Sequence, residues 1–141
     1  MKSTQPCWKC NQISDVYCIA SSGLIDEDGI ENSFMLFSDL SFIDAKVGKI
    51  IKNNFSTYSP DYSKTAGGVY YMNHCQICFV KMGDFFMHSE PEGAFFPTSV
   101  HSASNITLFK LREVDGKVAI NGSAGYQTPD FISQYSKKKE L

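Results

Sequence analysis

Apolar residues recur at helical spacing in one stretch of the chain, from Ser41 to Phe55. The residues on this apolar face are Ile43, Val47, Ile50, Ile51 and Phe55. The opposite face carries Lys46, Lys49 and Lys52. The pattern predicts one main amphipathic helix over residues 42–55 that packs on the core. Gly48 inside this helix costs about 1 kcal/mol relative to alanine, which indicates either close packing or a local weakness.

Short runs rich in β-branched and aromatic residues predict strands elsewhere. These runs are residues 16–20, 69–72, 106–114 and 117–121. Asp115-Gly116 separates the last two runs and is the strongest hairpin signal in the sequence, so we expect a C-terminal hairpin there. Residues 34–37 form an apolar run that is too short to assign to a strand or to the start of a helix.

The order of these elements predicts a single α+β domain covering residues 1–141. We expect a small, mostly antiparallel sheet on which the amphipathic helix packs and which the C-terminal hairpin completes. Thr128-Pro129-Asp130 predicts the start of a short helix near the end of the chain. A length of 141 residues fits one domain, although a metal ion still adds useful stability at this size.

Composition places the chain among ordinary globular proteins, since 43% of the residues are hydrophobic and 20% are charged. No apolar run approaches the roughly 20 residues that span a bilayer, and residues 1–6 lack the apolar segment of a signal peptide. We therefore expect the protein in the cytoplasm, with no membrane partner. Thiols stay reduced in that compartment, so paired cysteines there are more often metal ligands than disulfides.

The charged residues disfavour nucleic acid as a partner. The net charge is −2, and the 13 basic residues include a single arginine, Arg112. Arginine is the usual bidentate partner of guanine and phosphate, so the chain lacks the main base-reading side chain. The densest basic run, Lys137–Lys139, lies near the C-terminus, where we expect residues 137–141 to form a flexible, solvated tail.

Four of the five cysteines form two C-x-x-C pairs. The four are Cys7, Cys10, Cys75 and Cys78. Each pair presents two thiolates from a tight turn, and two such turns complete the tetrahedral shell that zinc prefers. The sequence therefore predicts a structural Zn²⁺ site that joins two distant parts of the chain. Four protein ligands leave no open position for water, so we expect this zinc to stabilise the fold and not to catalyse a reaction.

Other roles for the cysteines stay open at this point. C-x-x-C pairs carry thiol-disulfide chemistry at helix N-termini, but neither pair here follows a buried strand and opens a clear helix. Unpaired cysteines in the core are a further alternative. His74 and His88 are possible substitute ligands, but four cysteines already suffice, so we expect both histidines beside the site or at the surface. Cys18 lies in an apolar run and is expected to be a small buried side chain.

The sequence does not predict an enzyme. Some polar residues can be drawn as catalytic groups: Asp84, His88, Glu90, Glu92, Ser99, His101 and Ser102. None belongs to a nucleophile elbow, a metal-hydrolase helix or a phosphate-binding glycine loop. We expect them to form turns and a short helical stretch around Phe85 and Phe86, whose rings would cover the metal site.

An acidic loop is the candidate contact surface for a partner. Its carboxylates are Asp26, Glu27, Asp28 and Glu31. The loop lacks the ligand spacing and the closing glutamate of a calcium-binding EF-hand, so we expect an exposed acidic surface and no calcium site.

Four motifs of the chain recur together in one group of known proteins: Pro6-Cys7-Trp8-Lys9-Cys10, the stretch from Tyr70 to Cys78, Gly83–His88 and Glu90-Pro91. Through these motifs the chain resembles small bacterial zinc-ribbon-like proteins of uncharacterised function. In those proteins the first turn reads P-C-W-K-C, and the second reads C-P-x-C-G and continues into G-D-F-F-L-H. The resemblance covers roughly half of the chain and implies a bacterial or phage source, zinc bound by the four cysteines and no known activity.

This sequence departs from that pattern at two positions of the second turn. Gln76 stands where proline is common, and Phe79 stands where glycine usually follows. A bulky residue in a left-handed conformation is strained, so we expect altered geometry in this turn.

Two classes of function follow from these features. The first is a non-catalytic module whose partner is another protein, for example an immunity or antitoxin factor that occludes a toxin, because a closed metal site, mild acidity and many aromatic residues suit an interface. The second is a zinc-ribbon regulatory protein that binds nucleic acid through Lys137–Lys139 and exposed tyrosines. Thiol-disulfide exchange by the C-x-x-C pairs is a third, less favoured alternative.

Overall fold

The structure is a computed structural model that describes residues 1–31, 33–111, 114, 116–125 and 129–141. These residues form twelve strands and four helices. The helices are α1 (Ala45–Asn54), α2 (Asp84–Ser89), α3 (Val100–Ser104) and α4 (Pro129–Tyr135). The strands are β1 (Lys2–Pro6), β2 (Ile13–Tyr17), β3 (Ile19–Ser21), β4 (Leu24–Asp26), β5 (Gly29–Glu31), β6 (Met35–Ile43), β7 (Tyr58–Ser63), β8 (Gly68–His74), β9 (Lys81–Met82), β10 (Thr107–Lys110), β11 (Ile120–Gly125) and β12 (Lys137–Glu140).

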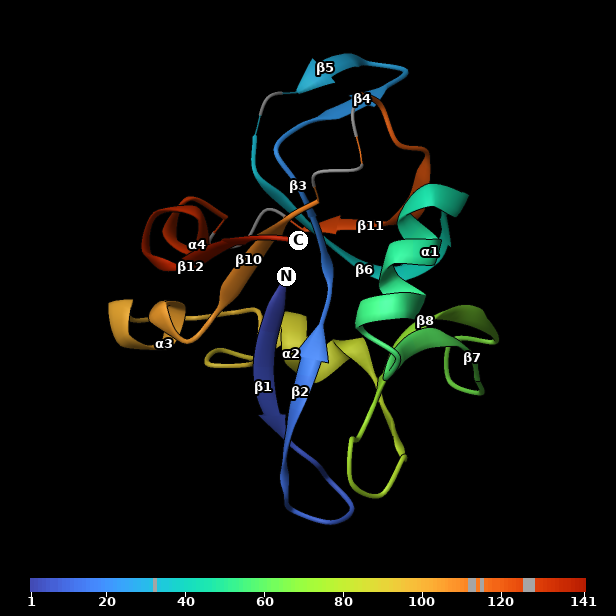
Figure 1. Ribbon diagram of the computed structural model, residues 1–141, viewed down its shortest axis with the longest axis vertical. Coiled ribbons are helices and arrows are strands. Elements are labelled where there is room, and N and C mark those ends of the chain that lie inside the picture. Colours follow the sequence, from blue (N-terminus) through green and yellow to red (C-terminus); the bar gives the residue numbers. More distant parts are fainter. Residues whose placement is uncertain (32, 112–113, 115, 126–128) are drawn as a thin grey trace.

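The strands form four small sheets (Figure 1). Their strand orders are β12-β10-β1-β2, β11-β6-β3, β7-β8-β9 and β4-β5. The β10–β12 pair is parallel, and the other described pairs are antiparallel. The predicted α+β class with mostly antiparallel strands is therefore confirmed, although the strands are divided among several sheets.

Helix α1 forms where the apolar periodicity predicts it. The side chain of Asp44 caps its N-terminus by accepting a hydrogen bond from the Lys46 N–H at 2.9 Å. Val47 and Ile51 are buried against the core. A Cβ atom on Gly48 would lie 3.2 Å from the Tyr71 hydroxyl, so close packing accounts for the glycine. The expectation of one main helix is not confirmed, because the chain also forms α2, α3 and α4.

The predicted C-terminal hairpin is wrong. Strands β10 and β11 belong to different sheets: β10 pairs with β1 and β12, and β11 pairs with β6. Gly116 of the predicted turn has a positive φ of 89°, while Asp115 lies outside the described residues. A turn signal reports a local reversal of the chain, but the partner of each strand is chosen by contacts far away in the sequence.

The expectation of a flexible C-terminal tail is also wrong. Residues 137–140 form β12, which pairs in parallel with β10 from Thr107↔Lys137 to Lys110↔Glu140. The Lys137 N–H donates to the Ile106 carbonyl at 2.9 Å, and the Leu141 N–H donates to the Lys110 carbonyl at 3.0 Å. Backbone pairing needs no apolar side chain, so a lysine run on a sheet edge carries no hydrophobic signal in the sequence.

The chain start interrupts the strand predicted over residues 16–20. The predicted strand is divided in two at Cys18, which lies between β2 and β3 and belongs to neither. The N-terminal amine of Met1 donates to the Cys18 carbonyl at 2.9 Å, and the Cys18 N–H donates to the Met1 carbonyl at 3.1 Å. The short C-terminal helix is confirmed as α4, with Thr128 outside the described residues.

The core has two parts. One lies beside the paired cysteines and includes Cys7, Cys75, Met87, Phe95, Ile106 and Ile132. The other lies under α1 and includes Met35, Phe37, Leu40, Val47, Ile51 and Tyr58. No helix in the described part of the chain is long and apolar enough to span a lipid bilayer.

Candidate metal centre

The first C-x-x-C turn lies in the loop that joins β1 to β2. The Cys7 N–H donates to the Gln12 carbonyl at 2.9 Å, and the Asn11 N–H donates to the Cys7 carbonyl at 2.9 Å. Asn11 has a φ of 57°, which is the left-handed conformation that asparagine tolerates well. The Lys9 N–H points at the Cys7 sulfur at 3.4 Å, as expected of a turn that stabilises a thiolate.

The second turn, between β8 and β9, repeats this geometry. The Cys75 N–H donates to the Val80 carbonyl and the Phe79 N–H donates to the Cys75 carbonyl, both at 3.0 Å. The Ile77 N–H points at the Cys75 sulfur at 3.4 Å, which matches the distance in the first turn. Phe79 has a φ of 59°, within two degrees of Asn11.

The expected distortion at Phe79 is therefore wrong. Its backbone takes the left-handed conformation. Because 71% of the residue is exposed to solvent, its ring makes no steric clash with the core that would change the turn. The strain of a bulky residue at positive φ, about 1–2 kcal/mol, is stored in the turn without changing its shape.

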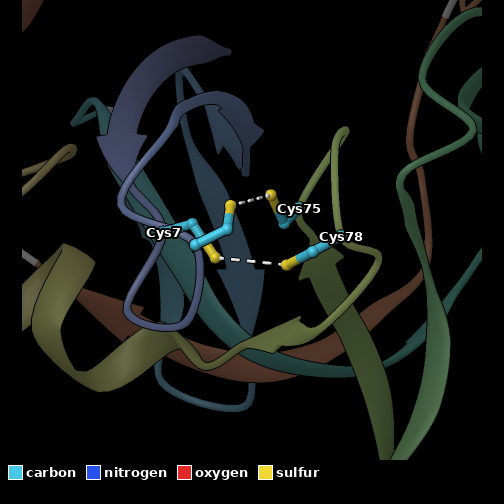
Figure 2. A group of neighbouring side chains, drawn as sticks. Cys7, Cys75 and Cys78 are labelled. Atoms are coloured by element: carbon cyan, nitrogen blue, oxygen red, sulfur yellow. Dashed lines mark hydrogen bonds between the residues drawn. The ribbon is translucent and has the colours of Figure 1, made fainter.

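The two turns face each other and bring the four sulfurs together (Figure 2). The Cys7 and Cys78 sulfurs are 3.6 Å apart, and the Cys10 and Cys75 sulfurs are 3.7 Å apart. All four sulfurs lie within 4.8 Å of one another. Four sulfurs at about 2.3 Å from a central zinc have tetrahedral edges of about 3.8 Å, so the cluster has the dimensions of a zinc shell. The predicted ligand set can thus hold one metal ion.

The centre sits at the boundary between core and solvent. Cys7 and Cys75 are buried, whereas Cys10 and Cys78 are half-buried. Hydrogen bonds from the Cys78 and Ile77 N–H groups lower the pKa of Cys75 to about 6, and the Cys10 N–H contributes most to lowering the pKa of Cys7. The Gln12 N–H also lowers the pKa of Cys10, but burial and the three other sulfurs outweigh it and raise this pKa to about 12. A bound cation would offset the electrostatic repulsion between the neighbouring thiolates.

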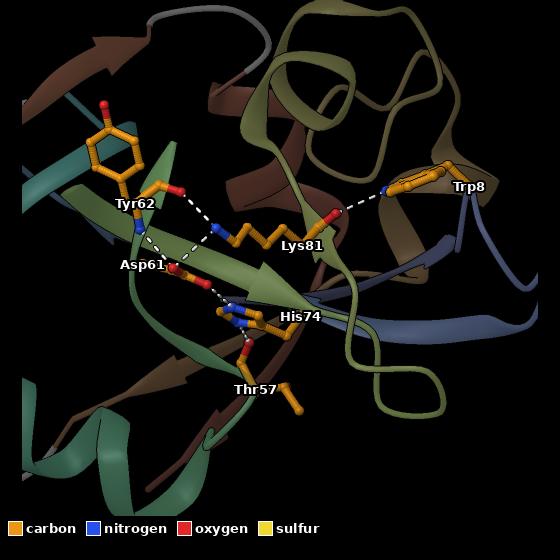
Figure 3. Close-up of polar contacts among 6 residues, drawn as sticks. All are labelled: Trp8, Thr57, Asp61, Tyr62, His74 and Lys81. Carbon is orange, nitrogen blue, oxygen red and sulfur yellow. Dashed lines mark hydrogen bonds and ion pairs between the residues drawn. The ribbon is translucent and has the colours of Figure 1, made fainter. Parts of the chain in front are cut away.

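Polar contacts outside the sulfurs join the two turns. The Gln76 N–H donates to the buried Ser14 hydroxyl at 3.0 Å, and the Gln76 side-chain oxygen accepts from the Asp15 N–H at 3.1 Å. The Trp8 indole N–H donates to the Lys81 carbonyl at 2.8 Å (Figure 3). A proline at position 76 could make neither Gln76 contact, which gives a physical reason for this departure from the zinc-ribbon-like pattern.

His74 faces away from the sulfurs although it precedes Cys75. Its Nδ1 lies 3.2 Å from the Thr57 carbonyl, and its Nε2 lies 3.0 Å from Asp61 (Figure 3). Lys81 forms an ion pair with the other oxygen of Asp61 at 3.2 Å. Hydrogen bonds from His74 and Lys81 hold the pKa of Asp61 down at about 2. His74 thus supports the strands that carry the second turn and is not a metal ligand in this arrangement.

Two other residues had roles that the sequence left open: in the structure His88 is half-buried and Cys18 is buried. His88 on α2 packs against the Phe95 ring, with ring centroids 5.0 Å apart, and burial lowers its pKa to about 4. Cys18 is 2% exposed, and burial raises its pKa to about 12, as expected of a small core side chain. Among the residues that the structure describes, the four paired cysteines form the one cluster suited to a metal ion.

Several of the polar residues that can be drawn as catalytic groups make local hydrogen bonds. Ser99 and Ser102 form a reciprocal cap at the N-terminus of α3, and the Thr98 hydroxyl donates to Glu92. Asp84 is buried and accepts a hydrogen bond from the Asp39 N–H at 2.9 Å.

Four large apolar side chains that lie close to the paired cysteines in the sequence are exposed to solvent. Their exposed fractions are 68% for Trp8, 62% for Ile13, 61% for Ile77 and 71% for Phe79. We call these four residues the knuckle surface. Phe85 and Phe86 are each 65% exposed, whereas Met87 of the same helix packs in the core cluster that contains Cys7 and Cys75. Phe86 lines a shallow hollow together with Trp8, so the expectation that the two phenylalanine rings cover the metal site stays a prediction. The sequence does not predict the knuckle surface, because residue type alone does not show whether a large apolar side chain is exposed or buried.

The predicted acidic loop is the hairpin formed by β4 and β5, in which Ile25 pairs with Ile30. Glu27 and Asp28 at its tip are exposed. The hairpin lies at the opposite end of the molecule from the loop between β1 and β2 (Figure 1). The two candidate contact regions are therefore far apart.

No protein-family model matches the chain, and no similar protein was found among curated proteins or solved structures. The resemblance to zinc-ribbon-like proteins therefore stays a prediction from the sequence motifs. Fold and site together define an α+β protein with a four-cysteine centre that can bind a metal ion.

Proposed function

We propose that this protein is a non-catalytic, zinc-stabilised module of the cytoplasm that binds another protein. Four thiolates at tetrahedral spacing are the ligand set of structural zinc. Tetrahedral thiolate sites also suit iron, and zinc is the better assignment here because a closed cysteine shell in a small domain most often stabilises the fold. A shell completed by protein ligands supports a structural role and not a catalytic one.

The single observation that carries the protein-binding role is the knuckle surface. Exposed aromatic and large aliphatic side chains are the common anchors of protein interfaces. The indole of Trp8 is held in place by its hydrogen bond to Lys81, so a partner would not have to order this side chain. Metal binding at the sulfurs would hold Trp8 of the first turn and Ile13 at the start of β2 close to the second turn, which carries Ile77 and Phe79.

The partner we propose is a protein, and an immunity or antitoxin role that occludes a toxin fits these features. A second contact through Asp26, Glu27, Asp28 and Glu31 would favour a partner with a basic surface, by charge complementarity.

A tagged full-length chain expressed in its native host tests this proposal. We expect wild-type protein to capture one stoichiometric partner, and a Trp8→Ser, Phe79→Asn double variant to capture at least about tenfold less, as for the loss of interface anchors. Asparagine keeps the left-handed conformation at position 79, so the zinc content should not change. The matched control is Val100→Ser on α3, which removes an exposed apolar side chain elsewhere. Equal capture by all three proteins, or no stoichiometric partner, contradicts the proposal.

Nucleic-acid binding is the second candidate because Lys137–Lys139 lie on an exposed strand and not on a frayed tail. Binding to DNA and RNA at about 150 mM salt distinguishes the two functions. The protein-binding proposal predicts little binding, whereas tight binding that weakens steeply with added salt would favour the nucleic-acid function instead.

A further inference from the structure

A large cavity lies away from the metal centre, under α1. Its volume is about 1480 Å³, and it is open to solvent. Its walls come from α1, from strands β3, β10 and β12, and from the segment that leads into β11. None of the four paired cysteines lines it. Pockets for small molecules usually enclose about 300–1,000 Å³, so this space is large enough for a sizeable ligand.

The walls of the cavity are mainly apolar. Val47 and Ile51 of α1 and Phe37 of β6 form part of its inner wall, and these three side chains are buried. Phe55 and Phe109 also line it, with ring centroids 5.6 Å apart. Apolar surface that stays in contact with water lacks the free energy gained on burial, which an apolar ligand covering this surface would supply.

The apolar character continues to the opening of the cavity. Ile25 and Ile30, which face each other across the β4–β5 hairpin, are 50% and 71% exposed and line the cavity. Solvent-exposed apolar side chains at the mouth of an apolar cavity indicate a path by which a hydrophobic molecule can enter.

Basic side chains are concentrated at the same cavity. The lysines among its lining residues are Lys110, Lys117, Lys138 and Lys139, whereas its carboxylates are Asp44 and Glu140. The four lysines are exposed, so their charges are not buried among the apolar walls. Among the described lining residues lysines thus outnumber carboxylates, and the exposed carboxylates of Glu27 and Asp28 lie at the tip of the hairpin that carries Ile25 and Ile30. Strand pairing holds Lys138 opposite Leu108 and Lys139 opposite Phe109.

An apolar interior with a basic opening is complementary to an amphipathic anion. We propose that the cavity binds a long-chain aliphatic carboxylate, the fatty-acid class, whose hydrocarbon chain lies among the apolar walls and whose carboxylate meets the lysines. This binding is separate from the metal centre and from the protein-binding role of the knuckle surface.

Equilibrium dialysis of the delipidated full-length protein against palmitate and against hexadecanol tests the proposal. The two probes share a hydrocarbon chain and differ in the charge of the head group. We expect palmitate to bind saturably, one molecule per chain, and hexadecanol to bind at least about tenfold more weakly, because only palmitate meets the lysines as an anion. Higher salt should weaken palmitate binding and leave hexadecanol binding unchanged.

Variants separate the head-group contact from the apolar walls. A Lys110→Glu, Lys138→Glu variant should weaken palmitate binding at least about tenfold without affecting hexadecanol, since both side chains are exposed and carry charge at the opening. Lys64→Glu, on an exposed residue outside the cavity lining, is the control for a change in charge and should bind palmitate as the wild type does. Ile50→Trp, at a half-buried position of the wall, should block both probes while thermal unfolding and metal content stay unchanged.

Three results would overturn the proposal. They are the absence of saturable palmitate binding, equal affinity for palmitate and hexadecanol, and palmitate binding that survives both the lysine substitutions and Ile50→Trp. Sedimentation showing that two copies of the chain cover this cavity, with Ile50→Trp producing monomers, would assign the apolar walls to self-association and equally rule the proposal out.

Discussion

Single residues decide how the metal centre is built and how the interior responds to pH. Asn11 and Phe79 take the same left-handed conformation, so two unlike side chains close two equivalent turns. Gln76 fixes the second turn to the strand that follows the first. At the N-terminus of α2, Asp84 is a carboxyl group held at 4% exposure, and burial raises its pKa to about 7. Such a group favours its neutral form in the folded state.

The raised pKa of Asp84 predicts that stability falls as pH rises. An aspartate in the unfolded chain has a pKa of about 3.9, so between about pH 4 and pH 7 the folded state binds the proton more tightly than the unfolded state. The free energy of unfolding should therefore decrease across this window as the pH increases. Asp84→Asn keeps an oxygen that can accept from the Asp39 N–H and removes the buried charge.

Urea unfolding of Asp84→Asn and wild type checks this prediction at about pH 4 and about pH 8. We expect similar stability at the lower pH and a variant more stable by roughly 2–4 kcal/mol at the higher pH. Any titration of the cysteines occurs in both proteins and cancels in the difference. A variant that is less stable than wild type at the higher pH would show that the Asp84 charge is stabilising.

Secondary-structure elements illustrate which features of this chain the sequence predicts. The position of α1 follows from its apolar face, and α4 follows from Pro129 and the residues after it. Residues 106–114 and 117–121 each contain part of a strand, but β10 and β11 do not pair, because their partners β1, β12 and β6 come from distant parts of the chain. Local patterns thus predict elements well, and they predict pairing poorly.

The edge strand β12 carries a prediction of its own. Deleting residues 137–141 should lower the free energy of unfolding by about 2 kcal/mol, because the hydrogen bonds to β10 are lost and its edge becomes exposed. Replacing Lys137, Lys138 and Lys139 by threonine keeps the backbone pairing and the strand propensity, so this variant should stay close to wild type. Chemical denaturation measures the free energy of unfolding of the deletion variant and of the threonine variant. Equal stability of the deletion variant and the wild type would mean that residues 137–141 do not pair in solution.

At the scale of the whole molecule, the metal centre connects the start of the chain to its middle. The cluster of four cysteines could be predicted from the sequence because two C-x-x-C pairs suit one shared tetrahedral site. The surroundings of the centre could not be predicted, because they depend on contacts between residues far apart in the sequence. They include the exposed rings of Trp8 and Phe79, the His74–Asp61–Lys81 group and the cavity under α1.

The centre is expected to contribute a large share of the stability of the fold, since Cys7 and Cys75 are themselves part of the core. The most direct measurement is the metal content of the purified full-length chain by elemental analysis. We predict one zinc per chain, loss of that zinc in Cys75→Ser, and retention of it in the matched control Cys18→Ser, whose buried sulfur lies outside the cluster. A wild-type chain that contains no zinc, or a Cys75→Ser variant that retains it, would contradict the four-cysteine zinc site.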